Sequence, residues 1–339
     1  MSQQHRNGKD SLSGNTTSWT ELNFIERQMI PIMDAGFDPK APDQAKWLEY
    51  QGSCIEPRWA QDANAITMDF GGVFHSTFLR WAVAINGLQI AAEKYKSREW
   101  LDTGKTFAIS GIRNQPGGEG PALTYVRAWD GDFASEVHES TMSMLPAWGF
   151  CNLYACLEEF IFKLFRAYLE HNPLSICKGD EFINLRKAYK ARSQSEGQLE
   201  TWNVLWKQRL DAWHRKKLYD NIEKVFNNFI QQTGLLIPVA YEGEYDYSTY
   251  AKTLGGIAMI RNCFIHGATE VPESLADFCD SNAAMFFMYE KGAKFVITSH
   301  ELATFEYFTD VFTQTLNLSF FELVAPGARE AHRQMLKSA

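Results

Sequence analysis

Apolar residues recur in steps of three and four along much of the chain, which is the spacing of amphipathic helices. An early stripe, Trp19, Leu22, Ile25 and Met29, is interrupted by Pro31. A longer stripe predicts a helix of about seven turns, through Phe74, Phe78, Trp81, Ile85, Leu88, Ala92 and Tyr95. Later stripes predict helices over 147–171, about 179–192, 195–233 and 248–267, then a last helix that runs to Leu318.

Local signals mark several of these helix ends. Gly234 and Gly267 each follow the last apolar position of a stripe, as C-cap glycines do. Ser248 is the expected N-cap of the helix that ends at Gly267. The segment Thr298-Ser299-His300-Glu301 has the pattern of a capping box and is expected to open the last helix.

Two short regions have strand-like patterns instead. The β-prone runs 107–109 and 123–126 flank the glycine-rich segment 114–121, which predicts a β-hairpin with a long loop. No GxxxxGK[ST] pattern is present there, so a phosphate-binding loop is not favoured. The runs 286–289 and 295–297 indicate a second, small hairpin.

These elements together predict a mainly α fold. Residues 1–20 have no apolar periodicity and are expected to form a flexible tail. Residues 21–140 form an N-terminal region, α with a β-hairpin, of unknown role, and residues 145–325 form a helical bundle. The acidic and then Ser/Thr-rich segment Asp130–Ser143 is the expected boundary between the two regions.

Composition narrows the class of protein. Hydrophobic residues make up 45% of the chain and aromatic residues 14%, enough for a well-buried core. The formal net charge of −8 argues against a protein that coats nucleic acid nonspecifically, because phosphate neutralisation dominates that affinity. It does not exclude an enzyme that admits a short stretch of RNA into a local basic pocket.

The six cysteines form no CxxC pair, so no structural zinc site is expected. The first twenty residues lack the apolar core of a signal peptide, and no apolar run is long enough to span a membrane. The simplest interpretation is a cytoplasmic protein with reduced thiols, no membrane contact and no bound cofactor or metal.

The helix that ends at Gly267 carries the strongest chemical signal, Arg261-Asn262-x3-His266. This segment resembles the HEPN superfamily (higher eukaryotes and prokaryotes nucleotide-binding). Ribonuclease members of that family carry Arg-x4-6-His late in a helix, often with a polar residue after the Arg. The resemblance covers about 180 residues of helical bundle and leaves the first 140 unexplained.

The two residue types suit RNA cleavage apart from any family name. Attack by the RNA's own 2′-hydroxyl needs a group that exchanges a proton near neutral pH, and His is the usual choice. It also needs a positive charge at the phosphorus centre, which a guanidinium supplies by binding two phosphate oxygens. The alternative is that Arg261 makes a surface ion pair and His266 stabilises the helix C-terminus.

Geometry limits how these residues meet. Five residues along a helix rotate the side-chain direction by about 140°, so Arg261 and His266 do not lie on one face. Asn262 and His266, four apart, do share a face, and Asn262 would orient His266 or a phosphate. In the HEPN family the groove forms where two motif helices meet, so the resemblance implies a homodimer. An ordinary polar helix position is the alternative for Asn262.

Other residues are secondary candidates. Glu158 and Glu159 lie mid-way along an apolar helix, and one of them would pair with Arg261 unless both lie on a solvated face. An aromatic-basic cluster, Trp202, Trp206 and Trp213 with Lys207, Arg209, Arg215, Lys216 and Lys217, would suit base stacking. Core packing with a solvated basic face is favoured for that cluster.

The sequence therefore predicts a metal-independent endoribonuclease acting on RNA, with Arg261, Asn262 and His266 as its catalytic residues. The resemblance implies products with a 2′,3′-cyclic phosphate and a 5′-hydroxyl, and a role as a toxin or an antiviral defence effector. A noncatalytic HEPN-like module that binds nucleotides or a protein is the main alternative. An unrelated helical protein with an accidental motif is a third.

Overall fold

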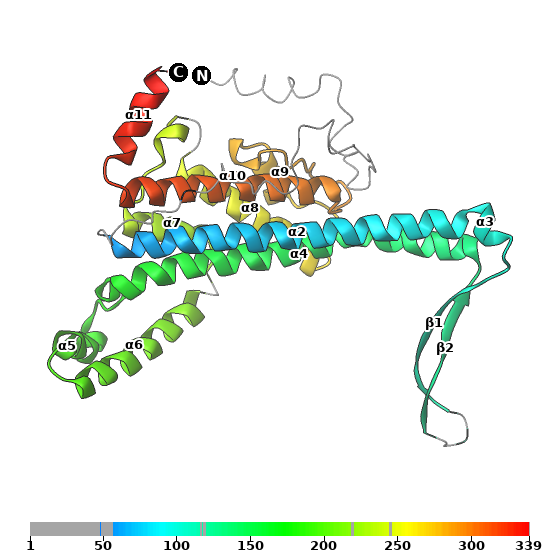
Figure 1. The fold of residues 1–339 in the computed structure, drawn as a ribbon, viewed down its shortest axis with the longest axis horizontal. Coiled ribbons are helices and arrows are strands. Elements are labelled where there is room, and N and C mark those ends of the chain that lie inside the picture. Colours follow the sequence, from blue (N-terminus) through cyan, green and yellow to red (C-terminus); the bar gives the residue numbers. More distant parts are fainter. Residues whose placement is uncertain are drawn as a thin grey trace. The chain divides into compact units, whose positions relative to one another are not determined.

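The computed structural model describes Leu48 and residues 57–115, 117, 120–217, 220–243 and 246–338. The predicted tail over 1–20 and the stripe from Trp19 to Met29 lie outside these residues. Within them the mainly α fold is confirmed (Figure 1). The helices are α2 (Arg58–Lys96), α3 (Arg98–Leu101), α4 (Gly131–His171), α5 (Ile183–Ala191), α6 (Glu196–Lys217), α7 (Ile222–Thr233), α8 (Tyr247–Ile265), α9 (Glu273–Cys279), α10 (Ser299–Val324) and α11 (Ala328–Ser338), and the strands are β1 (Phe107–Asn114) and β2 (Pro121–Trp129).

The described chain divides into two compact units. One, here called the hairpin unit, comprises Thr77–Phe150 and Ile297–Leu302. The other, the bundle unit, comprises Leu48, 57–76, Cys151–Val296 and the chain from Ala303 onward. Helices α2, α4 and α10 contribute residues to both units.

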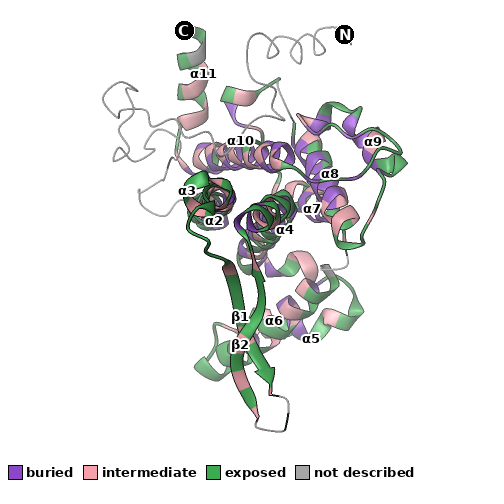
Figure 2. Ribbon diagram, turned by 90° about the vertical axis from the view of Figure 1, so that its right-hand side faces the viewer, coloured by how far each residue is buried: buried purple, intermediate pink, exposed green. Residues whose placement is uncertain are grey.

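In the hairpin unit, β1 and β2 pair antiparallel as predicted, from Phe107 opposite Trp129 to Asn114 opposite Pro121. A register shift, indicating a β-bulge, lies between Ile109 and Ser110. Most of the hairpin is exposed (Figure 2). Its base is held by Phe107, whose ring stacks on Trp129 at 5.8 Å and lies 5.2 Å from the ring of Tyr95.

The bundle unit has an aromatic core. Phe70 of α2 stacks on Phe160 of α4 with ring centroids 4.0 Å apart. Phe226 of α7 meets Phe312 of α10 edge to face at 5.2 Å. Phe165 of α4 meets Phe229 of α7 edge to face at 5.8 Å, so the aromatic side chains of all four helices belong to one core.

Helix α4 begins at Gly131 and continues through Asp130–Ser143, the segment expected to separate the two regions, so the helix predicted from residue 147 starts earlier. Asp130 caps the helix, accepting a hydrogen bond from the backbone N–H of Phe133 at 2.9 Å. Ser140 and Thr141 both donate to the carbonyl of Val137, at 2.9 and 2.7 Å. Their hydroxyls are thus satisfied inside the helix, so a polar composition did not break it.

The single helix predicted over 195–233 is also wrong. Helix α6 ends at Lys217, and Asn221 caps a new helix, α7, by accepting from the backbone N–H of Glu223 at 3.0 Å. The predicted end at Gly234 is confirmed, since Gly234 adopts φ 63°, where a side chain would be strained.

The small hairpin predicted over 286–297 does not form. Lys294 instead bridges to Glu270, and the backbone N–H of Val271 donates to Ala293 at 2.9 Å. Phe287 is fully buried, and the ring of Tyr289 stacks on Phe295 at 5.5 Å. Tertiary packing has therefore replaced the local pairing that the β-prone residues indicated.

The capping box of the last helix is confirmed. The Glu301 carboxylate accepts from the backbone N–H of Thr298 at 2.7 Å, and the Thr298 hydroxyl accepts from the N–H of His300 at 3.2 Å. The helix, α10, ends at Val324 and not at Leu318. No helix among the described residues is both long enough and apolar enough to cross a membrane.

Helix α8 is the element that positions the candidate site. Its N-cap is Asp246 and not Ser248, and the Asp246 carboxylate accepts from the backbone N–H of Thr249 at 2.7 Å. Most of the helix up to Ile260 is buried. At Gly256 the backbone lies so close to the ring of Phe278 in α9 that no side chain fits between them. The glycine at position 256 is therefore required by the lack of space for a side chain and not by an unusual backbone conformation.

We predict opposite effects from two glycine substitutions in helices. Gly72→Ala in α2 has open space around the new methyl group and should raise the free energy of unfolding by about 0.5–1 kcal/mol. Gly256→Ala must displace the Phe278 ring and should lower it by about 1–3 kcal/mol. Urea unfolding of both variants measures the difference, and a Gly256→Ala protein as stable as Gly72→Ala would contradict this packing.

Candidate functional site

Arg261 lies in the last turns of α8 and is half-buried. Its Nη1 donates a hydrogen bond to Oδ1 of Asn262 at 2.9 Å. Its guanidinium carbon lies 5.4 Å from the centroid of the Tyr154 ring in α4, a cation–π distance. Arg261 is therefore held by two neutral groups, one on its own helix and one on α4.

Glu158 is held by Tyr154 instead of by Arg261. The Tyr154 hydroxyl donates to Oε1 of Glu158 at 3.0 Å, one turn along α4. Burial, together with the charge of Glu158 and this hydrogen bond, raises the pKa of Tyr154 above its ordinary value. The hydroxyl consequently stays protonated and keeps donating to Glu158.

Glu159 belongs to a solvated face. It is exposed and lies 3.7 Å from Nζ of Lys163, one turn along α4. An exposed pair of this kind contributes little stability. Glu159 thus follows the solvated alternative, and in the described chain it makes no contact with Arg261.

The positive charge of Arg261 is not neutralised by any carboxylate of the described chain. Its field acts on neighbouring neutral groups. Burial raises the pKa of the Cys151 thiol, and the charge of Arg261 acts in the opposite direction. An arginine in this state has N–H donors and charge available for an anion.

His266 is fixed through its backbone and exposed through its side chain. It is the C-cap residue of α8, and its N–H donates to the carbonyl of Asn262 at 3.0 Å. Gly267 follows with φ 69°, and Ala268 N–H donates back to Cys263 at 2.8 Å, which completes a Schellman motif. The predicted C-cap glycine is confirmed. The imidazole forms no hydrogen bond or ion pair with other described residues.

Within one chain, the structure brings Arg261 and Asn262 together and adds Tyr154, which sequence reasoning missed. It does not bring Arg261 into contact with His266. The contact with Tyr154 joins α4 to α8 across about a hundred residues of sequence, so no local pattern indicates it. No group of three or more His, Cys, Asp or Glu side chains that could hold a metal ion occurs among the described residues.

Neither family models, nor curated proteins, nor solved structures give a match to this chain. The resemblance to HEPN domains accordingly depends on Arg261, Asn262 and His266 and on their place late in a helix.

The aromatic-basic cluster on α6 is a packing feature, as favoured from the sequence. Trp202 and Trp213 are buried, and Trp213 meets Phe165 edge to face at 5.0 Å. Arg209 donates to the carbonyl of Ile176 at 2.6 and 3.0 Å. The lysines and the remaining arginine described in this cluster, Lys207, Arg215 and Lys216, are exposed.

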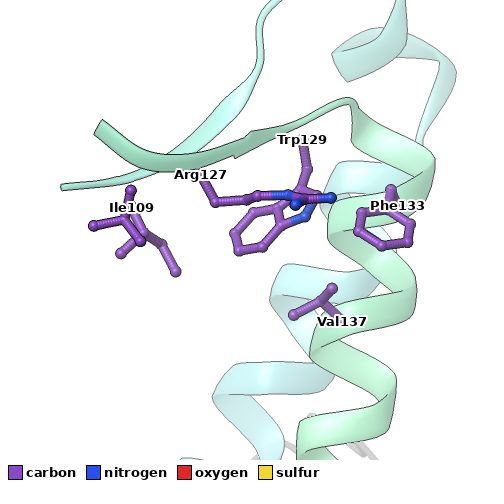
Figure 3. Close-up of a pocket in the computed structure, with 6 residues that line it drawn as sticks. Ile109, Arg127, Trp129, Phe133 and Val137 are labelled. Atoms are coloured by element: carbon purple, nitrogen blue, oxygen red, sulfur yellow. The ribbon is translucent and has the colours of Figure 1, made fainter. Parts of the chain in front are cut away.

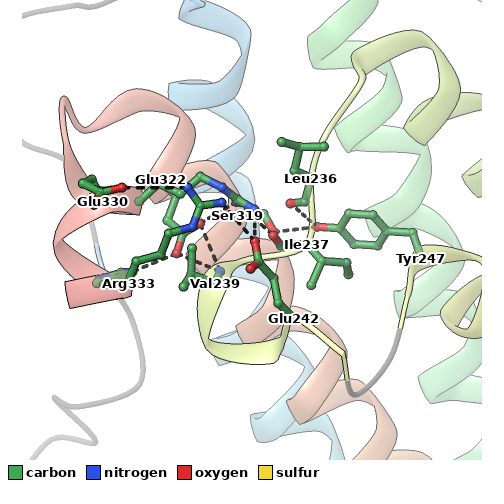
Figure 4. A network of polar contacts seen from close by, with 11 residues as sticks. Leu236, Ile237, Val239, Glu242, Tyr247, Ser319, Glu322, Glu330 and Arg333 are labelled. Atoms are coloured by element: carbon green, nitrogen blue, oxygen red, sulfur yellow. Dashed lines mark hydrogen bonds and ion pairs between the residues drawn. The ribbon is translucent and has the colours of Figure 1, made fainter. Parts of the chain in front are cut away.

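A second cluster of charged residues lies around Glu322 of α10 (Figure 4). The Glu322 side chain is 2% exposed and accepts from Nη1 of Arg329 and Nδ1 of His332, each at 2.8 Å. It also accepts from the backbone N–H of Val239 at 3.1 Å. Arg329 further donates to the carbonyl of Ile237 at 2.9 Å and to the Glu242 carboxylate.

The Glu322 cluster anchors α11 and the segment around Val239 to α10. Each charged group has protein partners, so the cluster offers no open position for a ligand, and its role is structural. Sequence reasoning overlooked it. The signal was available, since Glu322 interrupts the apolar run Phe320-Phe321-x-Leu323-Val324, where an unpaired carboxylate is costly.

We predict that Glu322→Ala lowers the free energy of unfolding by about 3 kcal/mol or more, because it leaves Arg329 and the Val239 N–H without their buried acceptor. Glu330→Ala is the matched control. Its side chain is 62% exposed and lies 3.9 Å from Arg333, so its loss should cost less than about 0.5 kcal/mol. Chemical denaturation measures both, and equal stabilities would contradict the anchoring role.

Proposed function

We propose that this protein is a metal-independent endoribonuclease of the HEPN type. The observation that supports the proposal is the state of the two motif residues. Arg261 forms no ion pair with any described carboxylate. His266, five residues later at the C-cap of the same helix, has an exposed imidazole. A phosphodiester needs both a fixed cation and a proton-transfer group, and this helix end supplies both.

The reaction would proceed by attack of the RNA 2′-hydroxyl on the adjacent phosphorus. His266 exchanges the proton, either removing it from the 2′-oxygen or giving one to the departing 5′-oxygen. The bond between phosphorus and the 5′-oxygen breaks, which leaves a 2′,3′-cyclic phosphate and a 5′-hydroxyl. Arg261 binds the non-bridging oxygens, and Asn262 acts as a positioning residue through its hydrogen bond to Nη1 of Arg261.

A second copy of the chain is part of the proposal. Because Arg261 and His266 point about 140° apart on one helix, they converge on one phosphate only if another α8 faces them. A twofold arrangement would place Arg261 of each copy beside His266 of the other. We therefore propose a homodimer through the bundle unit. From the resemblance to HEPN ribonucleases we also propose a role as a toxin or antiviral defence effector, in the cytoplasm.

One observation favours the alternative, a noncatalytic HEPN-like module that binds nucleotides or a protein. Within the described chain the side chains of Arg261 and His266 have no contact with each other and no shared hydrogen-bond partner. A module of this kind would use Arg261 for anion binding and would have no need of His266.

We predict that His266→Ala lowers the rate of cleavage of mixed cellular RNA by at least about 100-fold. Arg261→Ala should cause a similar loss, and Arg261→Lys should recover part of it, because the charge remains while the two-pronged geometry is lost. Cleavage by the unaltered protein should be unchanged by a chelator.

His75→Ala is the control for the histidine substitution, since His75 is also an exposed helical histidine. Its cleavage rate should equal that of the unaltered protein. Chelator-sensitive cleavage, or full activity of His266→Ala, would refute the proposed mechanism. RNA binding that is lost in Arg261→Ala, without any cleavage by the unaltered protein, would support the noncatalytic alternative.

A further inference from the structure

The hairpin unit contains an open surface pocket, here called the cavity, that has no part in the proposed cleavage site. It has a volume of about 550 Å³ and lies where the base of the hairpin meets the first turns of α4 (Figure 3). Its lining residues are Ile109 from β1, Val126, Arg127 and Trp129 from β2, and Phe133 and Val137 from α4.

Two aromatic rings form one wall of the cavity. Trp129 and Phe133 have ring centroids 6.2 Å apart, with their planes inclined at 43°. Trp129 is backed by Phe107, which stacks on it at 5.8 Å and also contacts the His138 ring of α4 at 5.2 Å. These contacts hold the Trp129 ring in place without a ligand. The Phe133 ring is 43% exposed, so it is accessible to a ligand.

Arg127 provides the single charged group in the lining, and like Trp129 it belongs to β2 (Figure 3). Across the described ranges, its guanidinium has no hydrogen-bond acceptor and no carboxylate partner. The nearest acidic residue in sequence, Asp130, is used as the cap of α4. An arginine beside an aromatic wall, with its donors unused, is suited to an anion attached to a planar ring.

The charges on the two hairpin strands also favour an anionic ligand. Strands β1 and β2 contain Arg113 and Arg127 and no acidic residue, although the whole chain has a net charge of −8. The two strands carry only positive charges, whereas the first turns of α4 carry Asp132 and Glu136. Apolar side chains add to the exposed surface of the strands, with Ile109 at 44% and Tyr125 at 77% exposure.

We propose that this cavity binds a nucleotide, with the base against Trp129 and Phe133 and the phosphate on Arg127. Stacking on aromatic rings suits any base, and a guanidinium suits its phosphate, so the chemistry is that of single-stranded nucleic-acid sites as well as of mononucleotide sites. The ligand is either a free nucleotide or one nucleotide of an RNA strand. The site lies in the hairpin unit and binds without cleaving, so it stands independently of the proposed nuclease activity.

The test uses the full chain with Arg261→Ala as the parent protein, which removes phosphate binding at the other candidate site. The probes are a fluorescein-labelled 2′-O-methyl decauridylate, which has no 2′-hydroxyl to attack, together with UMP, AMP and inorganic phosphate. Fluorescence anisotropy measures the labelled strand and calorimetry measures the others. Arg127→Gln and Phe133→Ala should each weaken binding by at least about fivefold.

Arg113→Gln is the matched control, because it removes the same charge from the same hairpin outside the cavity. It should change the affinity by less than about twofold. If the two cavity variants weaken binding of the decanucleotide, UMP and AMP, the result supports a free-nucleotide site. If they weaken binding of the decanucleotide alone, it supports an RNA strand. Equal effects of Arg113→Gln and Arg127→Gln, equal affinity for phosphate alone, or no binding of any probe at about 1 mM would overturn the proposal.

Discussion

The close packing of α8 against α9 is the constraint on which the candidate site depends. Gly256 lets the backbone lie directly against the Phe278 ring, and most of the helix before Ile260 is buried. Between Thr253 and Ile260 every residue except the half-buried Met259 is buried, so the helix next presents side chains to solvent from Arg261 onward. Arg261 lies in the last turns of α8 and His266 is its C-cap, and the Schellman motif at Gly267 fixes where the helix ends.

Glu322 and Glu158, two carboxylates of the bundle unit, differ in the groups that bind them. Around Glu322, the carboxylate binds Arg329 and His332 directly, and these contacts hold α11 in place. At the end of α8 the corresponding carboxylate, Glu158, is bound by the Tyr154 hydroxyl instead. Tyr154 also presents its ring to the Arg261 guanidinium, which forms no ion pair with a described carboxylate. Arg329 is thus paired with a buried carboxylate, whereas Arg261 has donors available for an anion.

Sequence patterns predicted much of the fold because helix stripes and caps are local. The stripe from Phe74 to Tyr95, the hairpin, the glycine ends of α7 and α8 and the capping box at Thr298 all depend on residues within a few positions. The failures have tertiary or side-chain causes. Serine and threonine hydroxyls were satisfied within α4, Asn221 began a new helix, and the 292–295 segment bridged to Glu270. At the site, the pairing of Arg261 with the adjacent Asn262 follows from sequence, whereas its contact with Tyr154 requires the packing of α4 beside α8.

The central claim is that Arg261 and His266 act together on one phosphate across a twofold interface. The most direct test mixes Arg261→Ala and His266→Ala proteins under conditions where subunits exchange, with exchange verified by mass-tagged copies. Each mixed dimer would then contain one site with both residues intact, so RNA cleavage should recover to about a quarter of the unaltered rate at full exchange. A mixture that exchanges subunits and stays as inactive as either variant alone would contradict the account.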